Sequence, residues 1–396
     1  MALNKRLRDL EENDLQALVD NQVSEHKTIE YKSALPGNAD GDKKEFLADI
    51  SSFANASGGD LIYGIREQAG IPIELSGLEL NDVDKEILRL ESCIQTGIAP
   101  RLFRIVETHS VSLPTKRRYA IVIRIRKSWA APHMVTFKND SKFFSRNSRG
   151  KYQLDVSELR SAFLLSEAVA ERARTFRTER LSNIIAGETP TALDENAPKI
   201  VLHIVPFGAF ELSAKPNIGL LTQVDNARLT EPLRLFPGGF PAPHYNFDGL
   251  LVSVQDSYTQ FFRNGSIECV DTSILAASKE RRFTSGSIYE TRLLQAMKRY
   301  LDAQQRLDVE LPSLVMVSLL GVKDYTIRFD INDFFLLDGH RIDRSNLVVS
   351  EILIDSYNCD LAVSMKPIFD AIANAAKWSR SMSYSEDGKL LLPNLE

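Results

Sequence analysis

The chain has few cysteines and no long apolar run. Its three cysteines, Cys93, Cys269 and Cys359, lie far apart without a CxxC pair, which argues against a disulfide framework and a zinc knuckle. No stretch approaches the roughly 18–20 apolar residues of a membrane span. Residues 1–16 form a charged amphipathic segment rather than a signal peptide. We therefore expect a cytoplasmic protein that does not enter a membrane.

Familiar enzyme motifs are also missing. The chain has no P-loop GxxxxGK[ST], no HExxH and no GxSxG, and its six histidines include no pair at catalytic spacing. The sequence therefore does not predict a P-loop ATPase, a zinc protease of the HExxH type or a serine hydrolase.

The composition is that of an ordinary globular protein. Its 396 residues are 43% apolar and 26% charged, which is enough to bury substantial cores. This length corresponds to two or three domains at roughly 150 residues each. The net charge of −5 conceals an uneven distribution along the chain.

A basic strip runs from residue 101 to residue 151, with thirteen Lys or Arg against two acids. A field of this sign attracts polyanions, of which nucleic acid is the commonest. Phe137, Phe143, Phe144 and Tyr152 lie among these bases, as single-strand binders often require for stacking. A solvated basic face without a ligand is the alternative. The nucleic-acid contacts that we predict are Lys116, Arg117, Arg118, Arg124, Arg126, Lys127, Lys142, Arg146, Arg149 and Lys151.

Helices and strands alternate in the first half, and Gly58 and Gly59 end one of the helices. This pattern predicts a first domain of the α+β class over residues 1–185, built on a mixed sheet. The elements that we predict are helices over 1–22, 43–56, 83–98 and 156–185, and strands over 28–33, 60–65, 102–109 and 118–125, the last two as a hairpin.

Residues 186–199 carry Gly, Pro and acids without apolar periodicity, which is typical of an exposed linker. We place the domain boundary there. Beyond it, residues 200–396 combine apolar strands with amphipathic helices, which predicts a separate α+β domain. No motif assigns this domain a role; sensing, regulation and oligomerisation are the candidates.

Carboxylates of the first domain fall near the ends of predicted strands. Glu30 and Lys32 are two apart on one strand, so their side chains share a face of the sheet. Glu25 lies five residues before Glu30, and Glu67 follows the next strand. If these strands are neighbours, the three acids suit a hard cation such as Mg²⁺ or Mn²⁺, and Lys32 suits an anionic substrate. The alternative is a set of surface acids, because a Glu-x-Lys pair occurs by chance in a chain of this length.

The same segment resembles the Schlafen AlbA_2 domain. The family's Glu-Phe/Tyr-Lys element corresponds to residues 30–32, its Phe-Ala-Asn phrase with paired glycines to residues 53–59, and its apolar strand ending in Gly-Val or Gly-Ile to residues 60–65. A later Gly-Leu and the run FFSRNSRGKYQLDVSELRSAF, with Arg146 at the family's usual arginine, extend the resemblance over roughly residues 20–165.

Within that family, the Schlafen nucleases cut structured RNA, notably transfer and ribosomal RNA, with three acids and a divalent metal. The resemblance places Glu25, Glu30 and Glu67 on these three positions. The third departs from the pattern, since the nucleases typically have Asp where this chain has Glu67. The resemblance thus implies catalytic Glu25, Glu30, Lys32 and Glu67, with the three glutamates as ligands of Mg²⁺ or Mn²⁺.

We therefore expect a metal-dependent endoribonuclease that acts on structured, tRNA-like RNA, with the antiviral or stress-defence role that the family implies. A non-catalytic nucleic-acid- or ATP-binding regulator is the second hypothesis, and an interaction scaffold is the third. Single-stranded DNA is an alternative substrate, and a homodimer could supply a second lobe to the RNA groove.

Overall fold

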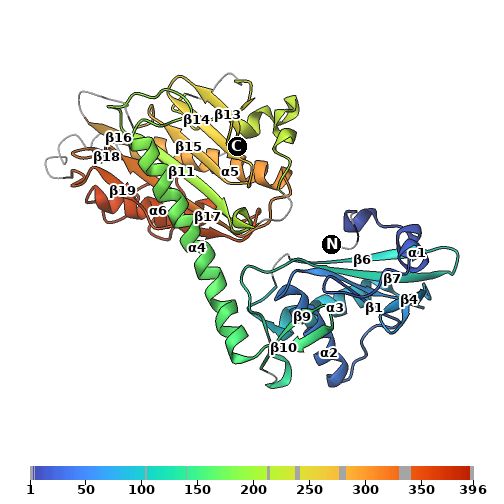
Figure 1. Ribbon diagram of the computed structural model, residues 1–396. Helices are drawn as coiled ribbons and strands as arrows, with labels where there is room; N and C mark the ends of the chain where they lie inside the picture. The colour runs from blue at the N-terminus through green and yellow to red at the C-terminus, as the bar shows by residue number, and fades with distance from the viewer. Residues whose placement is uncertain are drawn as a thin grey trace. The chain divides into compact units, whose positions relative to one another are not determined.

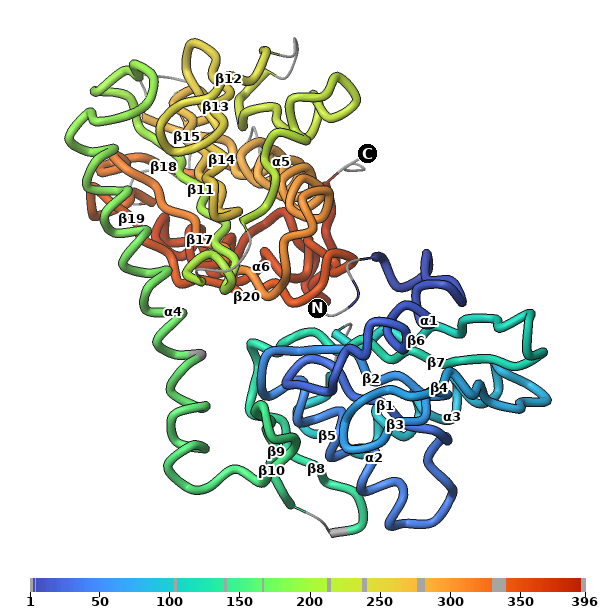
Figure 2. Tube along the Cα trace, turned by 45° about the vertical axis from the view of Figure 1, so that its right-hand side comes forward, coloured from blue at the N-terminus to red at the C-terminus, as the bar shows by residue number. Residues whose placement is uncertain are grey.

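The computed structural model describes residues 3, 5–102, 105–139, 141–211, 215–236, 241–275, 282–329 and 340–392. The chain divides into two compact units, residues 1–168 and 169–396. Figures 1 and 2 show the first unit in blue to teal and the second in green to red. Each unit combines helices with strands, which confirms the predicted α+β class.

The first unit is built on a four-stranded mixed sheet. The strands, in spatial order, are β1 (Ile29–Lys32), β2 (Gly59–Tyr63), β7 (Arg118–Ile125) and β6 (Val106–Leu113). β1 and β2 are parallel, and the other neighbours are antiparallel. Lys32 is the register partner of Tyr63, so the C-terminal ends of β1 and β2 lie side by side. The predicted hairpin is present as β6 and β7, with its second strand at the predicted residues and its first strand four residues later than the predicted 102–109.

Helix α2 (Asp40–Ala54) is enclosed between this sheet and a smaller one. Phe46, Leu47, Ile50 and Phe53 recur at spacings of three and four and are buried, which gives the helix its apolar faces. α2 contacts β8, β9 and β10 of the smaller sheet. The strands of that sheet, in spatial order, are β10 (Gly150–Gln153), β9 (Lys142–Asn147), β8 (Met134–Val135) and β5 (Ile98–Ala99).

Other short elements cover the remaining surfaces of the central sheet. α3 (Val83–Gly97) packs beside α2. On the face of the sheet opposite α2, Leu15 and Leu18 of α1 pack in one cluster with Ile29 and Tyr31 of β1. A single helix is predicted over residues 1–22, and α1 is the main helix within that range. The elements on that side and at the sheet edge are η1 (Leu7–Asp9), α1 (Glu12–Asp20), and the hairpin β3 (Arg66–Gln68) and β4 (Ile71–Glu74).

Gly58 and Gly59 join α2 to β2 as predicted. Gly58 has a φ of +70°, and a Cβ atom there would lie 2.7 Å from the carbonyl oxygen of Ile125. Only glycine adopts this turn without strain and clash. The turn brings β2 directly back beneath α2.

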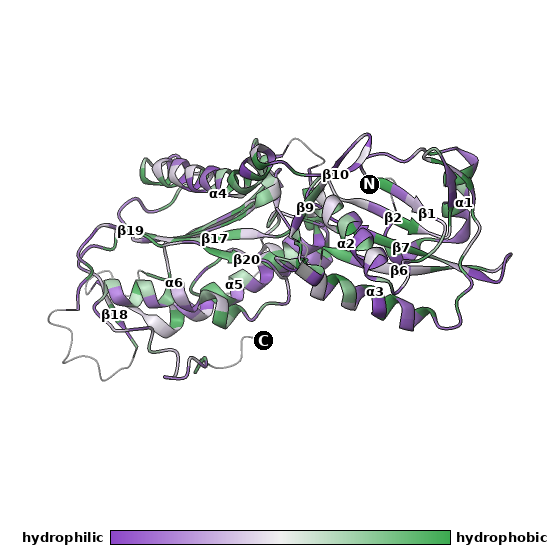
Figure 3. Ribbon diagram, turned by 90° about the horizontal axis from the view of Figure 1, so that it is seen from below, coloured by the Kyte–Doolittle hydropathy of each residue, from purple (hydrophilic) through white to green (hydrophobic). Residues whose placement is uncertain are grey.

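The second unit is an eight-stranded antiparallel sheet with helices on both faces. Figure 3 shows α5 and α6 on one side of the sheet and α4 on the other. The helices are α4 (Val156–Ile185), α5 (Gly286–Arg306) and α6 (Leu361–Ala375). The strands, in spatial order, are β12 (His244–Tyr245), β13 (Gly249–Val254), β14 (Ser257–Phe262), β15 (Ile267–Asp271), β11 (Lys199–Pro206), β17 (Ser313–Leu320) and β19 (Asn346–Val348), with β20 (Ile352–Ile354) also on β17.

Small elements complete the second unit. β16 (Phe283–Ser285) and β18 (Thr326–Arg328) form a parallel pair. Short 3-10 turns follow β11 at η3 (Phe207–Phe210), η4 (Ile218–Thr222) and η5 (Val224–Thr230), while η2 (Phe137–Asn139) lies between β8 and β9 of the first unit. Within the described ranges, no helix is long and apolar enough to cross a lipid bilayer.

The boundary between the units lies inside α4, between Ala168 and Val169, and not at residues 186–199 as predicted. Val169 is buried, and Arg174 and Arg177 bond to Glu351 and to the carbonyl oxygen of Val349 in the second unit. The helix is predicted correctly, but its apolar and arginine contacts assign its last half to the second unit.

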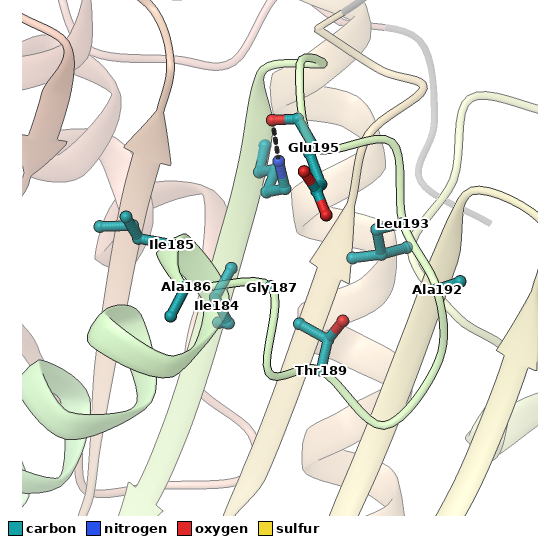
Figure 4. A pocket seen from close by; sticks show the side chains of 9 residues that line it. Ile184, Ile185, Ala186, Gly187, Thr189, Ala192, Leu193 and Glu195 are labelled. Atoms are coloured by element: carbon teal, nitrogen blue, oxygen red, sulfur yellow. Dashed lines mark hydrogen bonds between the residues drawn. The ribbon is translucent and has the colours of Figure 1, made fainter.

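Residues 186–199 form a packed loop on the second unit instead of a free linker. Leu193 packs with Leu181 and Ile184 of α4. The Lys199 ammonium donates to the carbonyl oxygens of three residues within residues 194–197, at 3.1 Å each. Figure 4 shows the loop around a cavity of about 200 Å³. The packing of Leu193 and the hydrogen bonds of Lys199 therefore attach this loop to the second unit.

Candidate active site

Glu30 lies between two cations on the α2 side of the central sheet. Its Oε1 is 2.6 Å from Lys32 Nζ, and its Oε2 is 2.6 Å from Nη2 of Arg146 on β9. The Arg146 guanidinium also stacks 3.8 Å from the ring centroid of Phe53. Burial raises the pKa of Glu30, but the charges of Arg146 and Lys32 outweigh burial and hold that pKa below its ordinary value. Glu30 is therefore a carboxylate at neutral pH.

Asp49 of α2 joins this group and was not among the residues predicted from sequence. Its Oδ1 is 2.6 Å from Nζ of Lys151, and its Oδ2 is 3.8 Å from Nζ of Lys32. The side chain is only 2% exposed. Burial, and then the charge of Glu30, raise the pKa of Asp49 to about 6. An aspartate on the apolar face of α2, three residues after Phe46, was the signal that sequence reasoning passed over.

These ion pairs link β1, α2, β9 and β10 in one network. Positive and negative groups alternate along it, from Lys151 through Asp49, Lys32 and Glu30 to Arg146. The Nε and Nη1 atoms of Arg146 are buried without a hydrogen-bond partner among the described atoms. We call this group the charge cluster; its members are Glu30, Lys32, Asp49, Arg146 and Lys151.

Glu25 and Glu67 meet at the β3–β4 turn beside the charge cluster. Glu67 Oε2 accepts a hydrogen bond from the Gly70 amide at 2.6 Å, and the Glu25 amide donates to the Gly70 carbonyl at 2.7 Å. Glu25 Oε1 accepts from the Tyr31 amide at 2.8 Å. Burial, opposed by that hydrogen bond and added to by the charges of Glu30 and Glu67, raises the pKa of Glu25. The three predicted acids thus share one electrostatic environment.

The three glutamates fit a hard divalent cation in donor type and in charge. Burial, and to a smaller extent the charges of Glu30 and Glu67, raise the pKa of Glu25, and a bound cation would offset this repulsion. Their positions fit less well, because both oxygens of Glu30 are bonded to cations. Within the described part of the chain, no three His, Cys, Asp or Glu side chains lie close enough together to hold a metal ion.

The predicted basic strip is divided between two places. Figures 1 and 2 show the tip of the β6–β7 hairpin and the β9–β10 turn at opposite ends of the first unit. At the hairpin, Lys116 and Arg118 donate to the carbonyl oxygens of Leu75 and Ser76, with Arg117 between them. At the other end, Lys142 and Arg149 are exposed, next to Arg146 and Lys151 of the charge cluster. Only the second group adjoins the candidate site.

Three bases in the middle of the strip have partners within the protein. Arg124 is the clearest correction, because its side chain is 7% exposed and its Nε is 2.7 Å from Asp60. It also donates to the carbonyl oxygens of residues 3 and 5, so it supports the fold and does not face a ligand. Arg126 pairs with Glu107 at 2.5 Å, and Lys127 lies 4.2 Å from the ring centroid of Trp129.

The aromatic residues of the strip are used for packing. Phe137 and Phe144 pack against the core of the first unit, and Phe143 forms an edge contact with Phe163 at 6.2 Å. The Tyr152 hydroxyl donates to Glu158. All four residues are half-buried, so part of each side chain is used for contacts within the protein.

Asn55, at the C-terminal end of α2, forms hydrogen bonds with residues of the smaller sheet and of the segment before it. Its amide nitrogen donates to the carbonyl oxygens of His133 and Phe144 at 2.8 Å, and its oxygen accepts from the His133 amide at 2.7 Å. The His133 ring is bonded to the Pro100 carbonyl and to Ser128 and is buried. Both residues hold β9, and with it Arg146, in place.

The matched family corresponds to this part of the chain. Residues 25–155 match the family model described as Schlafen, AlbA_2. The first unit contains a Schlafen AlbA_2 domain. The matched residues include every member of the charge cluster together with Glu25 and Glu67. Functions related to nucleic acids, of a nuclease-like kind, are attributed to this family. The match ends before the second unit.

Other comparisons add little to this assignment. No curated protein matches the chain. A solved structure, the DIP2311 protein from Corynebacterium diphtheriae, is similar at 20% identity over 36% of this chain and 27% of that one, with a TM-score of 0.24. The chain therefore spans about a quarter of that protein's length, and a likeness of this extent carries no argument about function.

Proposed function

We propose that the AlbA_2 domain is an endoribonuclease that cleaves structured RNA at Glu25, Glu30 and Glu67. The observation that carries the proposal is that Glu25 lies within the electrostatic influence of Glu30 and Glu67, while Glu30 is paired with Lys32 and Arg146. A carboxylate whose pKa is raised by burial and by neighbouring acids, as that of Glu25 is, is a candidate functional group when it lies beside cations.

In this proposal, Lys32 and Arg146 bind the scissile phosphate through charge-assisted hydrogen bonds and stabilise the negative charge that develops on it. Glu25, Glu30 and Glu67 would hold a Mg²⁺ or Mn²⁺ ion, which would supply an activated water and further neutralisation of charge. The phosphate would take over the contact that Arg146 and Lys32 now make with Glu30, which frees the Glu30 oxygens.

The placement of the bases supports RNA recognition by backbone shape. Lys142 and Arg149 extend the positive surface from the charge cluster along β9 and β10. Since the nearby aromatic side chains already make contacts within the protein, recognition in this proposal rests on phosphates and 2′-hydroxyls. Structured RNA offers both at fixed spacing.

A second candidate is a binding protein that performs no chemistry. It is favoured by the two ion pairs of Glu30, which occupy both of its oxygens at 2.6 Å. If these pairs persist when RNA is bound, Glu30 has no oxygen left for a cation, and the domain would bind RNA without cutting it.

A cleavage assay separates the two functions. The full chain is incubated with total transfer RNA in Mn²⁺, Mg²⁺ or EDTA, and the products are compared with those of Glu30→Gln on a denaturing gel. Discrete fragments that need metal and are absent with Glu30→Gln support the nuclease. Intact RNA in every lane, together with a gel shift by the folded parent protein, would favour the binding protein.

A further inference from the structure

Asp49 and its partner Lys151 are the residues of the charge cluster that the proposed reaction does not use. We propose that Asp49 is a positioning residue of a phosphate site, in which it holds the ammonium groups of Lys32 and Lys151 so that they and Arg146 receive one backbone phosphate of RNA. The inference rests on the proposed function only for the identity of the ligand as RNA.

The position of Asp49 between two lysines supports this role. Its two oxygens are divided between Nζ of Lys151 at 2.6 Å and Nζ of Lys32 at 3.8 Å. The two lysines come from β10 and β1, which belong to different sheets. A lysine has a flexible stem and loses rotamer freedom when it binds. A buried carboxylate on a helix between them removes much of that freedom before the ligand arrives.

Arg146 is the third hydrogen-bond donor of the proposed phosphate site, and two of its nitrogens lack an acceptor among the described atoms. Its side chain is 3% exposed and is fixed by Glu30 and by the Phe53 ring. Both of these nitrogens are buried, and such groups are costly unless an acceptor reaches them. A phosphate oxygen is an acceptor that matches arginine in charge and geometry.

The net charge of the cluster matches one phosphodiester. Lys32, Arg146 and Lys151 carry three positive charges, and Glu30 and Asp49 carry two negative charges when both are ionised. Glu45, which also pairs with Lys151, is 65% exposed on its side chain and is screened by solvent. The cluster therefore has a net charge of +1 for a group of charge −1.

A positioning role and simple charge repulsion predict opposite effects of an Asp49 substitution on RNA affinity. If Asp49 only contributes a negative charge near the RNA, Asp49→Asn removes a repulsion and tightens binding. If Asp49 positions the two lysines, the same substitution loosens them and weakens binding, although the protein becomes more positive. The sign of the change in affinity therefore decides between the two.

The test measures the affinity of the full chain for a fluorescent RNA hairpin in EDTA, so that binding is observed without cleavage. We expect Asp49→Asn to raise the Kd about tenfold, as for loss of a hydrogen bond to a charged group. Asp42→Asn is the matched control, since it makes the same change on an exposed position of α2 and should leave the Kd within about twofold. An unchanged or lower Kd for Asp49→Asn would overturn the inference.

The salt dependence of the Kd separates positioning from a partial loss of folding. A misfolded fraction lowers the active concentration but leaves the slope of log Kd against log salt unchanged. Loss of phosphate neutralisation lowers that slope by roughly 0.7–0.9 per contact. A parent-like slope in Asp49→Asn would count against the inference.

Lys151→Gln provides a second variant at a position that is less buried, since the side chain of Lys151 is 16% exposed and that of Asp49 is 2% exposed. If Asp49 acts through Lys151, adding Asp49→Asn to Lys151→Gln should weaken binding less than Asp49→Asn weakens the parent. Full additivity would contradict the role. A parent that binds RNA but does not cut it would remove the nuclease and leave this inference standing, whereas cleavage with an unaffected Kd in Asp49→Asn would do the reverse.

Discussion

Glu30 in the first unit and Glu268 in the second each bond an arginine and a second basic side chain. Glu268 accepts two hydrogen bonds from Arg180 at 2.8 Å, one from the Tyr258 hydroxyl at 2.8 Å and a contact with His203 Nε2 at 3.0 Å. All of these lie between α4 and the sheet, and the Glu268 side chain is fully buried. Burial opposes ionisation, but Arg180 and His203 lower the pKa of Glu268 to about 2.

The two networks differ in solvent exposure and in whether buried nitrogens of the arginine lack an acceptor among the described atoms. Arg180 gives both sides of its fork to Glu268, and the network attaches α4 to the second unit; His203 Nδ1 is its one buried nitrogen without a hydrogen-bond partner among the described atoms. In the charge cluster, Lys32 is 36% exposed on its side chain, and Arg146 keeps two nitrogens without a partner among the described atoms. A network that is closed stabilises the fold, whereas one that is open to solvent and short of an acceptor is a candidate for binding a ligand.

The largest effect should come from breaking the closed network. Glu268→Gln should lower the free energy of unfolding of the second unit by about 3–5 kcal/mol, because Arg180 would remain buried without a counter-charge. The chain has two tryptophans, Trp129 in the first unit and Trp378 in the second. Urea unfolding followed by Trp378 fluorescence, in a Trp129→Phe background, measures this change. A loss below about 1 kcal/mol would show that the network is not structural.

A substitution in the charge cluster should affect activity more than stability. Lys32→Gln should reduce RNA cleavage about 100-fold and lower the unfolding free energy by only about 1 kcal/mol, since the Lys32 side chain is 36% exposed and Glu30 keeps its ion pair with Arg146. Trp129 fluorescence in a Trp378→Phe background gives the stability, and a tRNA gel gives the activity. A stability loss equal to that of Glu268→Gln would remove the distinction between the networks.

The second unit should be most stable at mildly acidic pH. The low pKa of Glu268 contributes stability that is lost as the pH falls from about 4.5 towards 2. Burial raises the pKa of Asp271 and of Glu290 to about 7. Their folded forms bind protons more tightly than their unfolded forms, so stability falls as the pH rises from about 4 to 7.

We expect the Tm reported by Trp378 to be at least roughly 5 °C higher at pH 5 than at pH 8, since 1 kcal/mol shifts the Tm by about 2–4 °C in a unit of this size. Glu290→Gln should reduce that difference, because it removes one of the two carboxyl groups that become charged. A Tm that rises steadily to pH 8 would contradict the assignment.

The smallest effect concerns the divided basic strip. Arg149→Ala, beside the charge cluster, should raise the Kd for RNA about two- to threefold through loss of one phosphate contact. Arg117→Ala, at the far hairpin tip, is the matched control and should leave the Kd unchanged. Equal effects from the two substitutions would indicate that the RNA runs along the whole unit.

The sequence was sufficient for much of the fold and for part of the site. Apolar periodicity located α2, α3 and the β6–β7 hairpin, and the Glu-x-Lys spacing placed Glu30 and Lys32 on one face. Pairing across distant segments could not be read in this way. Arg124 looked like a surface base because nothing local reveals that Asp60 lies opposite it on β2. The end of the first unit was misplaced because α4 has no change of composition where its contacts pass to the second unit.

The charge cluster is assembled from three stretches of chain that end at residues 32, 49 and 151. A ribosome that has made the first 140 residues has therefore made every carboxylate of the candidate site but neither Arg146 nor Lys151. In this unfinished chain Glu30 lacks one of its two cations, and Asp49 keeps only the more distant of its two lysines. During synthesis the candidate site is thus completed only when the closing hairpin of β9 and β10 has been made.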